Sequence, residues 1–299
     1  MMKKKILFIG GAPKCGTSAL FDLLTQTKFF LASDPKETFY FMDQDYPTLN
    51  TKANYWKNGF KGFDNFFPSA STEHFRLEGS THLIYQKSIP AILSREDCRF
   101  LFILREPANR ISSSFQYSLN NLAAFSVSLS FENYVDILLK RDVDKLNKYI
   151  KSPMSLDILK KELELSCYVY HLRNWYELIP QDKIKIVLYE DLINSSEGIL
   201  ANILGWLKLD YNARYMLNSK NRTAGVRNKN LHRKLQPINK LLPTGRVKQI
   251  LKNTYFKFQY KDINPNQADE RAITLLRQYF IKPNQQLQNE LNIDISKWS

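Results

Sequence analysis

Cysteine is scarce in this sequence, and its few cysteines lie far apart. The 299 residues include only Cys15, Cys98 and Cys167, with no CxxC pair among them. An odd number of widely spaced thiols argues against a disulfide scaffold and against a cysteine-built zinc site. We therefore expect no bound metal and a reducing compartment.

Long apolar runs are also missing, and no stretch approaches the length of a membrane span. The start of the chain, three lysines followed by Ile6–Ile9, superficially resembles a signal peptide. The apolar run is too short for one, and Gly10 and Gly11 interrupt it at once. We expect a buried strand there and no transmembrane segment.

Acidic residues are absent from one long segment. Residues 211–261 contain many Lys and Arg but no Asp or Glu, and the whole chain has a formal net charge of +14. The positive electrostatic field of such a chain attracts anionic partners: nucleic acid, an acidic glycan, an anionic membrane face or a phosphorylated cofactor. The chain has no helix-turn-helix signature, zinc spacing or RNP-type aromatic motif, so a nucleic-acid-binding protein is only an alternative.

The apolar residues predict an α/β fold. They make up 43% of the chain, enough for a large core. Short apolar runs predict strands at 5–9, 76–80, 99–104 and 183–188. Longer stretches predict five helices: 17–27, one that begins at Pro107, 163–178, one from Ser195 or Ser196 to Trp206, and 267–291 with a break near Pro283. This alternation indicates a doubly wound parallel sheet flanked by helices, in a single domain over 1–299. The aromatic-rich residues 35–75 are expected to form loops and short helices over a cleft.

The loop of residues 11–18, Gly-Ala-Pro-Lys-Cys-Gly-Thr-Ser, follows the first strand and opens the first helix. Backbone N–H groups and the helix dipole at such a junction attract an anion. A nucleoside-triphosphate loop would end in Gly-Lys-Ser/Thr, but here the lysine is Lys14 and no lysine separates Gly16 from Thr17. The strand predicted at 183–188 is followed by Tyr189-Glu190-Asp191 rather than by a lone Asp for Mg²⁺, so a P-loop kinase or NTPase is an alternative only.

Two segments carry a family resemblance. Residues 13–20, Pro-Lys-Cys-Gly-Thr-Ser-Ala-Leu, closely resemble the 5′-phosphosulfate loop of sulfotransferases that use 3′-phosphoadenosine 5′-phosphosulfate (PAPS). Residues 104–114 resemble the family's 3′-phosphate motif, an Arg at a strand end and a Ser eight residues later. Further similarity at 171–175, 184–192 and 276–298 extends the resemblance over nearly the whole chain, and residues 36–41, 78–81 and 219–222 are similar to the heparan-sulfate-type and bacterial branch.

The resemblance implies a P-loop fold with PAPS as the donor co-substrate and no metal. Its cofactor-binding residues would be Pro13, Lys14, Cys15, Gly16, Thr17, Ser18 and Ala19 at the 5′ end, and Arg105, Ser113, Lys220 and Arg222 at the 3′-phosphate. Lys14 would stabilise charge on the leaving phosphate bridge. For Arg110, a nucleotide contact and a structural ion pair are both open.

The resemblance offers two candidates for the catalytic base. Glu37 stands where heparan-type relatives place a catalytic Glu, and His82 stands where cytosolic small-molecule relatives place a catalytic His. Either side chain can accept a hydroxyl proton. Lys36 would assist by neutralising the transferring group or an acidic acceptor. A surface carboxylate at Glu37 and a structural histidine at His82 are the alternatives without a catalytic role.

We expect the acceptor to be a hydroxyl of a carbohydrate, a glycolipid or another glycoconjugate. The basic segment 211–261 and the aromatic residues 35–75 motivate this expectation, and the basic surface also suits peripheral contact with a membrane. Golgi members of the family carry a membrane anchor and some carry a disulfide, neither of which is seen here. The sequence therefore predicts a cytoplasmic, bacterial enzyme that does not act on nucleic acid.

Overall fold

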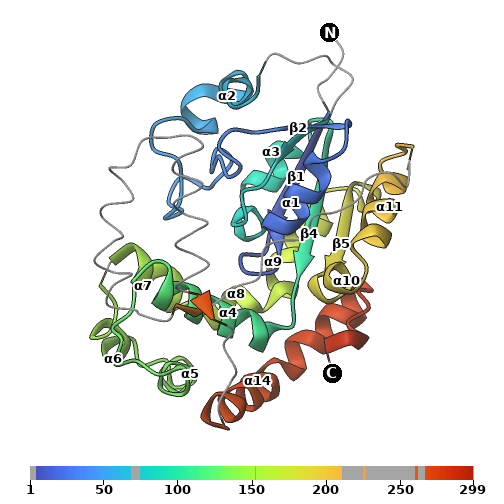
Figure 1. Ribbon diagram of the computed structural model, residues 1–299. Coiled ribbons are helices and arrows are strands. Elements are labelled where there is room, and N and C mark those ends of the chain that lie inside the picture. The colour runs from blue at the N-terminus through green and yellow to red at the C-terminus, as the bar shows by residue number, and fades with distance from the viewer. Residues whose placement is uncertain are drawn as a thin grey trace. The chain divides into compact units, whose positions relative to one another are not determined.

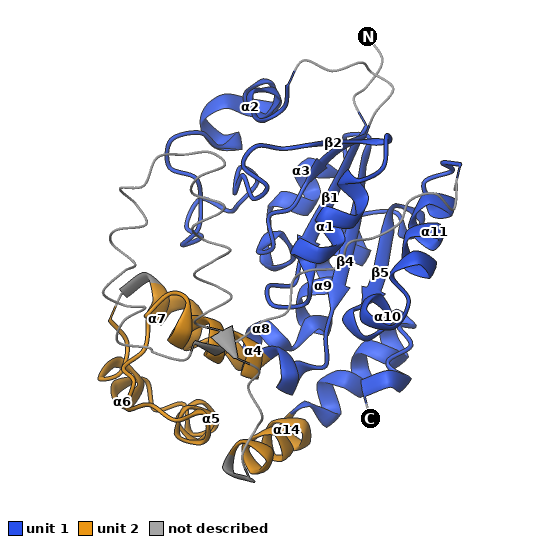
Figure 2. Cartoon of the chain, in the orientation of Figure 1, with its two compact units in different colours: residues 1–110, 164–221, 280–299 blue, residues 111–163, 222–279 orange. Residues whose placement is uncertain are grey.

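The computed structural model describes residues 5–68, 75–151, 153–210, 225–226, 260–261 and 267–298. The chain forms two compact units, coloured blue and orange in Figure 2. Unit 1 comprises Met1–Arg110, Glu164–Asn221 and Phe280–Ser299, and unit 2 comprises Ile111–Leu163 and Arg222–Tyr279. Each unit is built from segments that are distant in the sequence.

Unit 1 is organised around a five-stranded sheet (Figure 1). Its strands are β1 (Ile6–Gly11), β2 (Phe30–Ala32), β3 (Phe75–Glu78), β4 (Cys98–Leu104) and β5 (Ile184–Leu188). The order is β2-β3-β1-β4-β5, and every neighbouring pair is parallel. The parallel sheet and four of its strands are confirmed, whereas the three-residue β2 was not predicted.

The central strand β1 is a topological switch point. Helix α1 (Thr17–Thr25) leads from β1 to β2 on one side, and the chain leaves β4 towards β5 on the other side. Right-handed crossovers in opposite directions put helices on both faces of the sheet, as Figure 1 shows for α1 and α9 (Tyr168–Leu178). Ligands of such sheets bind outside the carboxyl ends of the strands at this switch point.

Helices pack on the sheet through aromatic side chains. Unit 1 contains α2 (Tyr55–Phe63), α3 (Ile89–Leu93), α9, α10 (Tyr189–Asn194), α11 (Ser196–Trp206), and the 3-10 helices η1 (Asp64–Phe66), η2 (Leu83–Tyr85), η3 (Gln181–Lys183) and η4 (Ser296–Trp298). Trp175 of α9 is fully buried, with ring centroids 4.9 Å from Phe100 and 5.1 Å from Phe102. The expected helix over 163–178 is two helices, α8 (Glu162–Ser166) and α9, because Cys167 between them has ψ of 72°.

Unit 2 is mainly helical. It contains most of α4 (Pro107–Asn120), α5 (Phe131–Lys140), α6 (Val143–Asn147), α7 (Pro153–Leu159) and the first part of α14 (Gln267–Leu291), with the paired strands β6 (Gly225–Val226) and β7 (Tyr260–Lys261). Its core contains Phe115, Phe125 and Tyr134, whose ring centroids are 5.1 to 5.4 Å apart. Helix α14 has its expected bounds but runs through Pro283 without the expected break. Among the helices of the described ranges, none is both long and apolar enough to span a membrane.

Candidate functional site

The loop of residues 11–18 ends on an open helix terminus. Gly16 occupies the N-cap of α1 with φ of 93°, a left-handed conformation that glycine adopts readily, and no side chain caps the helix. The first N–H groups of a helix have no acceptor within the helix, so here they face outward. Ser18 is exposed in this first turn, Lys14, Pro13 and Ala19 are half-buried, and Thr17 and Cys15 are buried.

The loop is held from behind by buried side chains. Arg110, 1% exposed, donates from Nε to the Pro13 carbonyl at 3.1 Å, from Nη1 to Ser166 Oγ at 2.7 Å and from Nη2 to Tyr85 Oη at 3.3 Å. Ala12 N donates to the Ile103 carbonyl at 2.8 Å, which ties the loop to β4. These contacts give Arg110 a structural role in fixing the loop.

Cys15 packs among the buried side chains that hold the loop. Its Sγ lies 3.5 Å from Tyr168 Oη, which donates to the Arg105 carbonyl at 2.8 Å. Burial raises the pKa of the Cys15 thiol, and the nearby Arg110 opposes this only in part. A buried, protonated thiol is a poor nucleophile, so Cys15 belongs to the structure of the loop.

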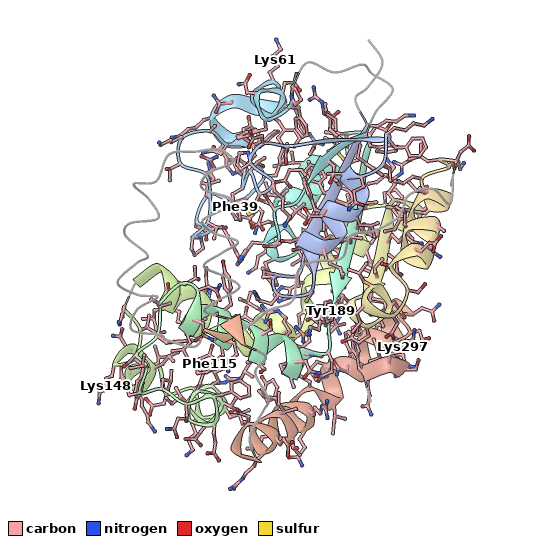
Figure 3. All side chains as sticks on the ribbon, viewed as in Figure 1. Phe39, Lys61, Phe115, Lys148, Tyr189 and Lys297 are labelled. Atoms are coloured by element: carbon pink, nitrogen blue, oxygen red, sulfur yellow. The ribbon has the colours of Figure 1, made fainter. Side chains whose placement is uncertain are left out.

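Arg105 follows β4 directly at the same edge of the sheet. Its guanidinium lies 4.5 Å from the ring centroid of Tyr189, the first residue of α10 (Figure 3), and its Nη1 lies 3.5 Å from the Lys14 carbonyl. The Tyr189 ring also closes on the loop, because a Cβ at Gly16 would lie 2.7 Å from Tyr189 Cδ2. Tyr189 thus supports both the loop and Arg105. In the sequence, Tyr189 follows the strand predicted at 183–188, but no role in the site was predicted for it.

The 3-10 helix η4 packs against the residue that follows Tyr189. Glu190 accepts hydrogen bonds from Glu106 N and from Trp298 Nε1, each at 3.1 Å. Trp298 is 8% exposed and packs on Tyr168 with a centroid distance of 5.9 Å. The segments after β4 and β5 are therefore joined by the Glu106–Glu190 hydrogen bond, and η4 packs against Glu190 and Tyr168.

Of the other residues expected at the 3′-phosphate, the structure describes only Ser113. Ser113 is half-buried on α4, in unit 2. Lys220 and Arg222, with nearly all of the basic segment 211–261, lie outside the described residues. Their expected roles stay predictions.

Lys36 links Glu37 to the first turn of α1. Lys36 Nζ donates to Glu37 Oε1 at 3.2 Å and lies 3.4 Å from Ser18 Oγ, while Thr81 Oγ1 donates to Glu37 Oε2 at 3.2 Å. Both charged side chains are half-buried, 22% exposed for Lys36 and 31% for Glu37. Gly79 leaves room for this arrangement, since a Cβ there would lie 2.9 Å from Lys36 Cε.

Glu78, which the sequence analysis did not assign to the site, fastens these segments together. Its buried carboxylate accepts hydrogen bonds from Thr38 N at 2.8 Å, Thr38 Oγ1 at 2.9 Å, Ser80 N at 2.9 Å and Ser80 Oγ. Burial raises the pKa of Glu78, and the four donors oppose that rise. Glu78 therefore positions Glu37, which precedes Thr38, and Thr81, which follows Ser80. Only the pairing of residues 38 and 80 in space reveals this role.

His82 is next to Thr81 and has a different set of partners. A hydrogen bond of 2.9 Å joins its Nδ1 to Tyr46 Oη, and its ring centroid lies 6.4 Å from that of Phe39, labelled in Figure 3. Burial, and secondarily the positive charge of Arg110, lower the pKa of His82 to about 4. The imidazole is therefore neutral at pH 7.

We expect this histidine to make the protein less stable in acid. The unfolded chain would bind the His82 proton with a pKa near 6.5, so the stabilising effect is full above about pH 6.5 and is lost as the pH falls towards 4. Burial also lowers the pKa of His171, which adds a smaller dependence of the same sign. Urea unfolding between about pH 4 and 7 should show a shallower decline for His82→Gln than for the wild type. Equal slopes would contradict the buried, neutral state of His82.

The comparisons with known proteins identify the family. The family model for a sulfotransferase domain matches residues 4–262. The chain belongs to the sulfotransferase family. The match supports sulfuryl transfer as the reaction, rather than the ATP-dependent alternative. Assignment of the full range 1–299 to one domain stays a prediction.

One solved structure supports the fold of this sulfotransferase, and others are similar to it at lower TM-scores. A sulfotransferase from Alicyclobacillus acidocaldarius is 14% identical, with a TM-score of 0.64 over 99% of this chain and 98% of that chain. The mouse sulfotransferase SULT7A1, complexed with 3′-phosphoadenosine 5′-phosphate (PAP), is 17% identical, with a TM-score of 0.44 over 70% and 60% of the two chains. Retinol dehydratase in complex with androsterone and PAP is 12% identical, with a TM-score of 0.45 over 97% and 82%. No curated protein matches the sequence significantly.

Proposed function

We propose that this sulfotransferase transfers a sulfuryl group from PAPS to a hydroxyl of a saccharide-bearing acceptor, with Glu37 as the general base. The observation that carries the proposal is the contact of Lys36 with both Ser18 and Glu37. It brings a carboxylate to the open N-terminus of α1, where an anionic sulfuryl donor would bind.

The residues around α1 suit the 5′ end of the donor. The uncapped N–H groups at Gly16–Ser18 and the Ser18 hydroxyl offer hydrogen-bond donors to a phosphate, and the helix dipole favours negative charge. Lys14 and Lys36 add two positive charges beside the same turn. In sulfuryl transfer the acceptor oxygen bonds to sulfur while the bond from sulfur to the bridging phosphate oxygen breaks. We assign stabilisation of charge on that leaving oxygen to Lys14.

Glu37 suits the role of base better than His82. Removing a hydroxyl proton needs an acceptor within hydrogen-bond reach of the attacking oxygen. Glu37 is connected through Lys36 to the α1 turn, while the His82 ring contacts Tyr46 and the aromatic rings around it. We assign His82 to positioning the acceptor side of the site.

Arg105 suits the 3′-phosphate. A guanidinium offers paired donors that match a phosphate, and stacking on Tyr189 fixes its plane. It lies at the carboxyl end of β4, the strand next to β1 at the switch point. Ser113, Lys220 and Arg222 are proposed to complete this end of the nucleotide.

The test is a transfer assay with sulfur-labelled PAPS and a panel of neutral, amino and acidic oligosaccharides and glycolipids. The proposal predicts label in an acid-stable sulfate ester on at least one glycan, and release of PAP in equal amount. Label found only on amines or phenols would contradict the saccharide hydroxyl as acceptor. Transfer of labelled phosphate from γ-labelled ATP in a parallel reaction, with no transfer from PAPS, would contradict the donor.

A further inference from the structure

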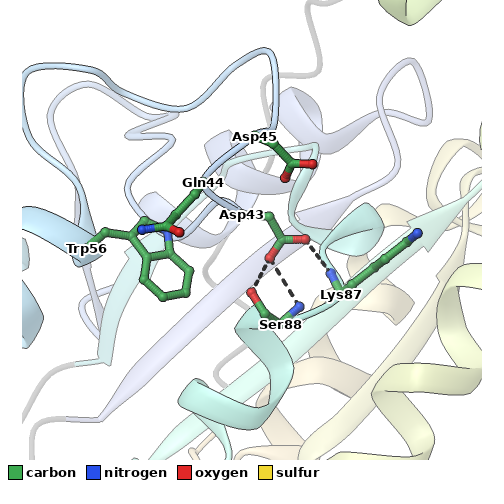
Figure 4. A pocket seen from close by; sticks show the side chains of 6 residues that line it. All are labelled: Asp43, Gln44, Asp45, Trp56, Lys87 and Ser88. Carbon is green, nitrogen blue, oxygen red and sulfur yellow. Dashed lines mark hydrogen bonds between the residues drawn. The ribbon is translucent and has the colours of Figure 1, made fainter.

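A surface pocket of about 470 Å³ lies in unit 1 between the chain that follows Glu37 and the chain that follows His82 (Figure 4). Its lining consists of Asp43, Gln44, Asp45, Trp56, Lys87 and Ser88. None of these residues was part of the site predicted from the sequence. We propose that this pocket binds one sugar ring of the acceptor, a ring that carries no anionic group. The proposal rests on the proposed function and names the acceptor class for it.

The pocket has a fixed aromatic wall. Trp56 is 37% exposed, and its Nε1 donates to the Met42 carbonyl at 2.7 Å. This hydrogen bond occupies the polar edge of the indole and sets the orientation of the ring. An exposed, oriented aromatic face next to a few polar groups is typical of ligand pockets. The C–H face of a sugar ring is a suitable partner for such a flat apolar surface.

The opposite wall is rigid as well. The Asp43 carboxylate accepts hydrogen bonds from Lys87 N at 2.7 Å, Ser88 N at 3.1 Å and Ser88 Oγ at 2.6 Å, as the dashed lines of Figure 4 indicate. Asp43 is thus used to hold the wall together. A preformed wall lowers the cost of ordering side chains when a ligand binds.

Polar groups remain for the hydroxyls of a sugar. The side chains of Gln44 and Asp45 are exposed and make no hydrogen bond with another side chain or backbone group of the described residues. An amide and a carboxylate provide both donors and acceptors.

The charge of the pocket selects against acidic sugars. Two aspartates against one lysine leave a formal charge of −1 among the lining residues, in a chain whose total is +14. A sulfate or carboxylate on the bound ring would be repelled and would lose hydration. An uncharged or amine-bearing ring avoids this cost. The pocket lining is therefore negative although the chain as a whole is positive.

A hydrogen-bond frame connects the pocket to the transfer site. Gln86 Oε1 accepts from Asp43 N at 2.7 Å, and Gln86 Nε2 donates to the His82 carbonyl at 2.7 Å. Tyr46, one residue after Asp45, holds the His82 ring. The pocket and the segment that contains Thr81, a partner of Glu37, are therefore parts of one fixed assembly. A ring in the pocket would flank the ring whose hydroxyl receives the sulfuryl group.

The test is saturation-transfer NMR and titration of the full chain with three probes: an N-acetylglucosamine trimer, a glucosamine trimer and a sulfated, carboxylated disaccharide. The first two should bind, and Trp56→Ala should weaken their binding by about tenfold or more, with a smaller loss for Trp56→Phe. Tyr170→Ala, which removes an exposed aromatic ring of α9 outside the pocket, should change nothing. Asp45→Asn, which removes a negative charge from the lining, should weaken binding of the glucosamine trimer more than binding of the N-acetylglucosamine trimer.

Three outcomes would overturn the pocket assignment: no binding of either trimer, binding that does not depend on Trp56, or tighter Trp56-dependent binding of the acidic probe. PAP binding measured on the same samples separates this failure from that of the proposed function. Wild-type protein that binds PAP but no trimer contradicts only the subsite. Protein that binds the trimers but not PAP contradicts the proposed donor. Unchanged PAP binding by each variant shows that the substitution has not unfolded the chain.

Discussion

Replacing Glu37 with Gln is expected to lower kcat by about 10²- to 10⁴-fold, the range over which a positioned general base contributes. The amide keeps the size of the side chain and its contact with Thr81, but it cannot take a proton from the acceptor hydroxyl. Binding of PAP should change little, because Glu37 contacts Lys36 and Thr81 rather than the N–H groups of α1. Initial rates with labelled PAPS and a PAP titration measure the two quantities separately.

Two further variants sharpen this result. Glu177→Gln makes the same chemical change on an exposed face of α9 and should leave kcat unchanged. His82→Gln should reduce kcat much less than Glu37→Gln does. If His82→Gln caused the larger loss while PAP binding was retained, the base would be His82 and our assignment would be wrong.

Replacing Arg105 with Ala is expected to weaken PAP binding by about 10- to 100-fold, the value of one charge-assisted contact to a buried phosphate. Affinity for 5′-AMP, which has no 3′-phosphate, should stay the same. Arg105→Lys should give an intermediate loss, because a lysine keeps the charge but has neither the planar fork nor the stacking on Tyr189. Calorimetric titrations with the two nucleotides measure the difference directly.

The matched control for this prediction lies on the same strand. Arg99 belongs to β4 but lies near its other end, where it pairs with Asp97 at 3.1 Å. Arg99→Ala should leave both affinities unchanged. Equal losses for PAP and 5′-AMP in Arg105→Ala would mean that Arg105 supports the loop as a whole, through its contact with Lys14, and does not read the 3′-phosphate.

The central strands of this fold were predictable because they are buried on both faces. Every residue of β1 is buried, so its sequence is a continuous apolar run bounded by charge and glycine. Strand β2 was missed because Phe30–Ala32 is too short to show a pattern. The break at Cys167 between α8 and α9 was missed because the apolar spacing continues across it.

The positions of the loop of residues 11–18, between β1 and α1, and of Arg105 at the end of β4 were predictable because they follow the order of the chain. Contacts between segments that are far apart in the sequence were not predictable, because spacing along the sequence does not show which segments lie close together in the fold. Examples are the meeting of Lys36 with Ser18, the four hydrogen bonds of Glu78, and the stacking of Tyr189 on Arg105. The same reason hid the pocket at Trp56, whose lining comes from three separate stretches of chain.

The central claim is that the α1 turn and Arg105 form a site for a 3′-phosphorylated adenine nucleotide. A thermal-shift titration with PAP, run beside 5′-AMP and ATP·Mg²⁺, tests it most directly, because a ligand that binds only the folded state raises the melting temperature with its concentration. We predict a concentration-dependent rise with PAP and much smaller shifts with the other two. A larger rise with ATP·Mg²⁺, or no response to PAP, would contradict the account.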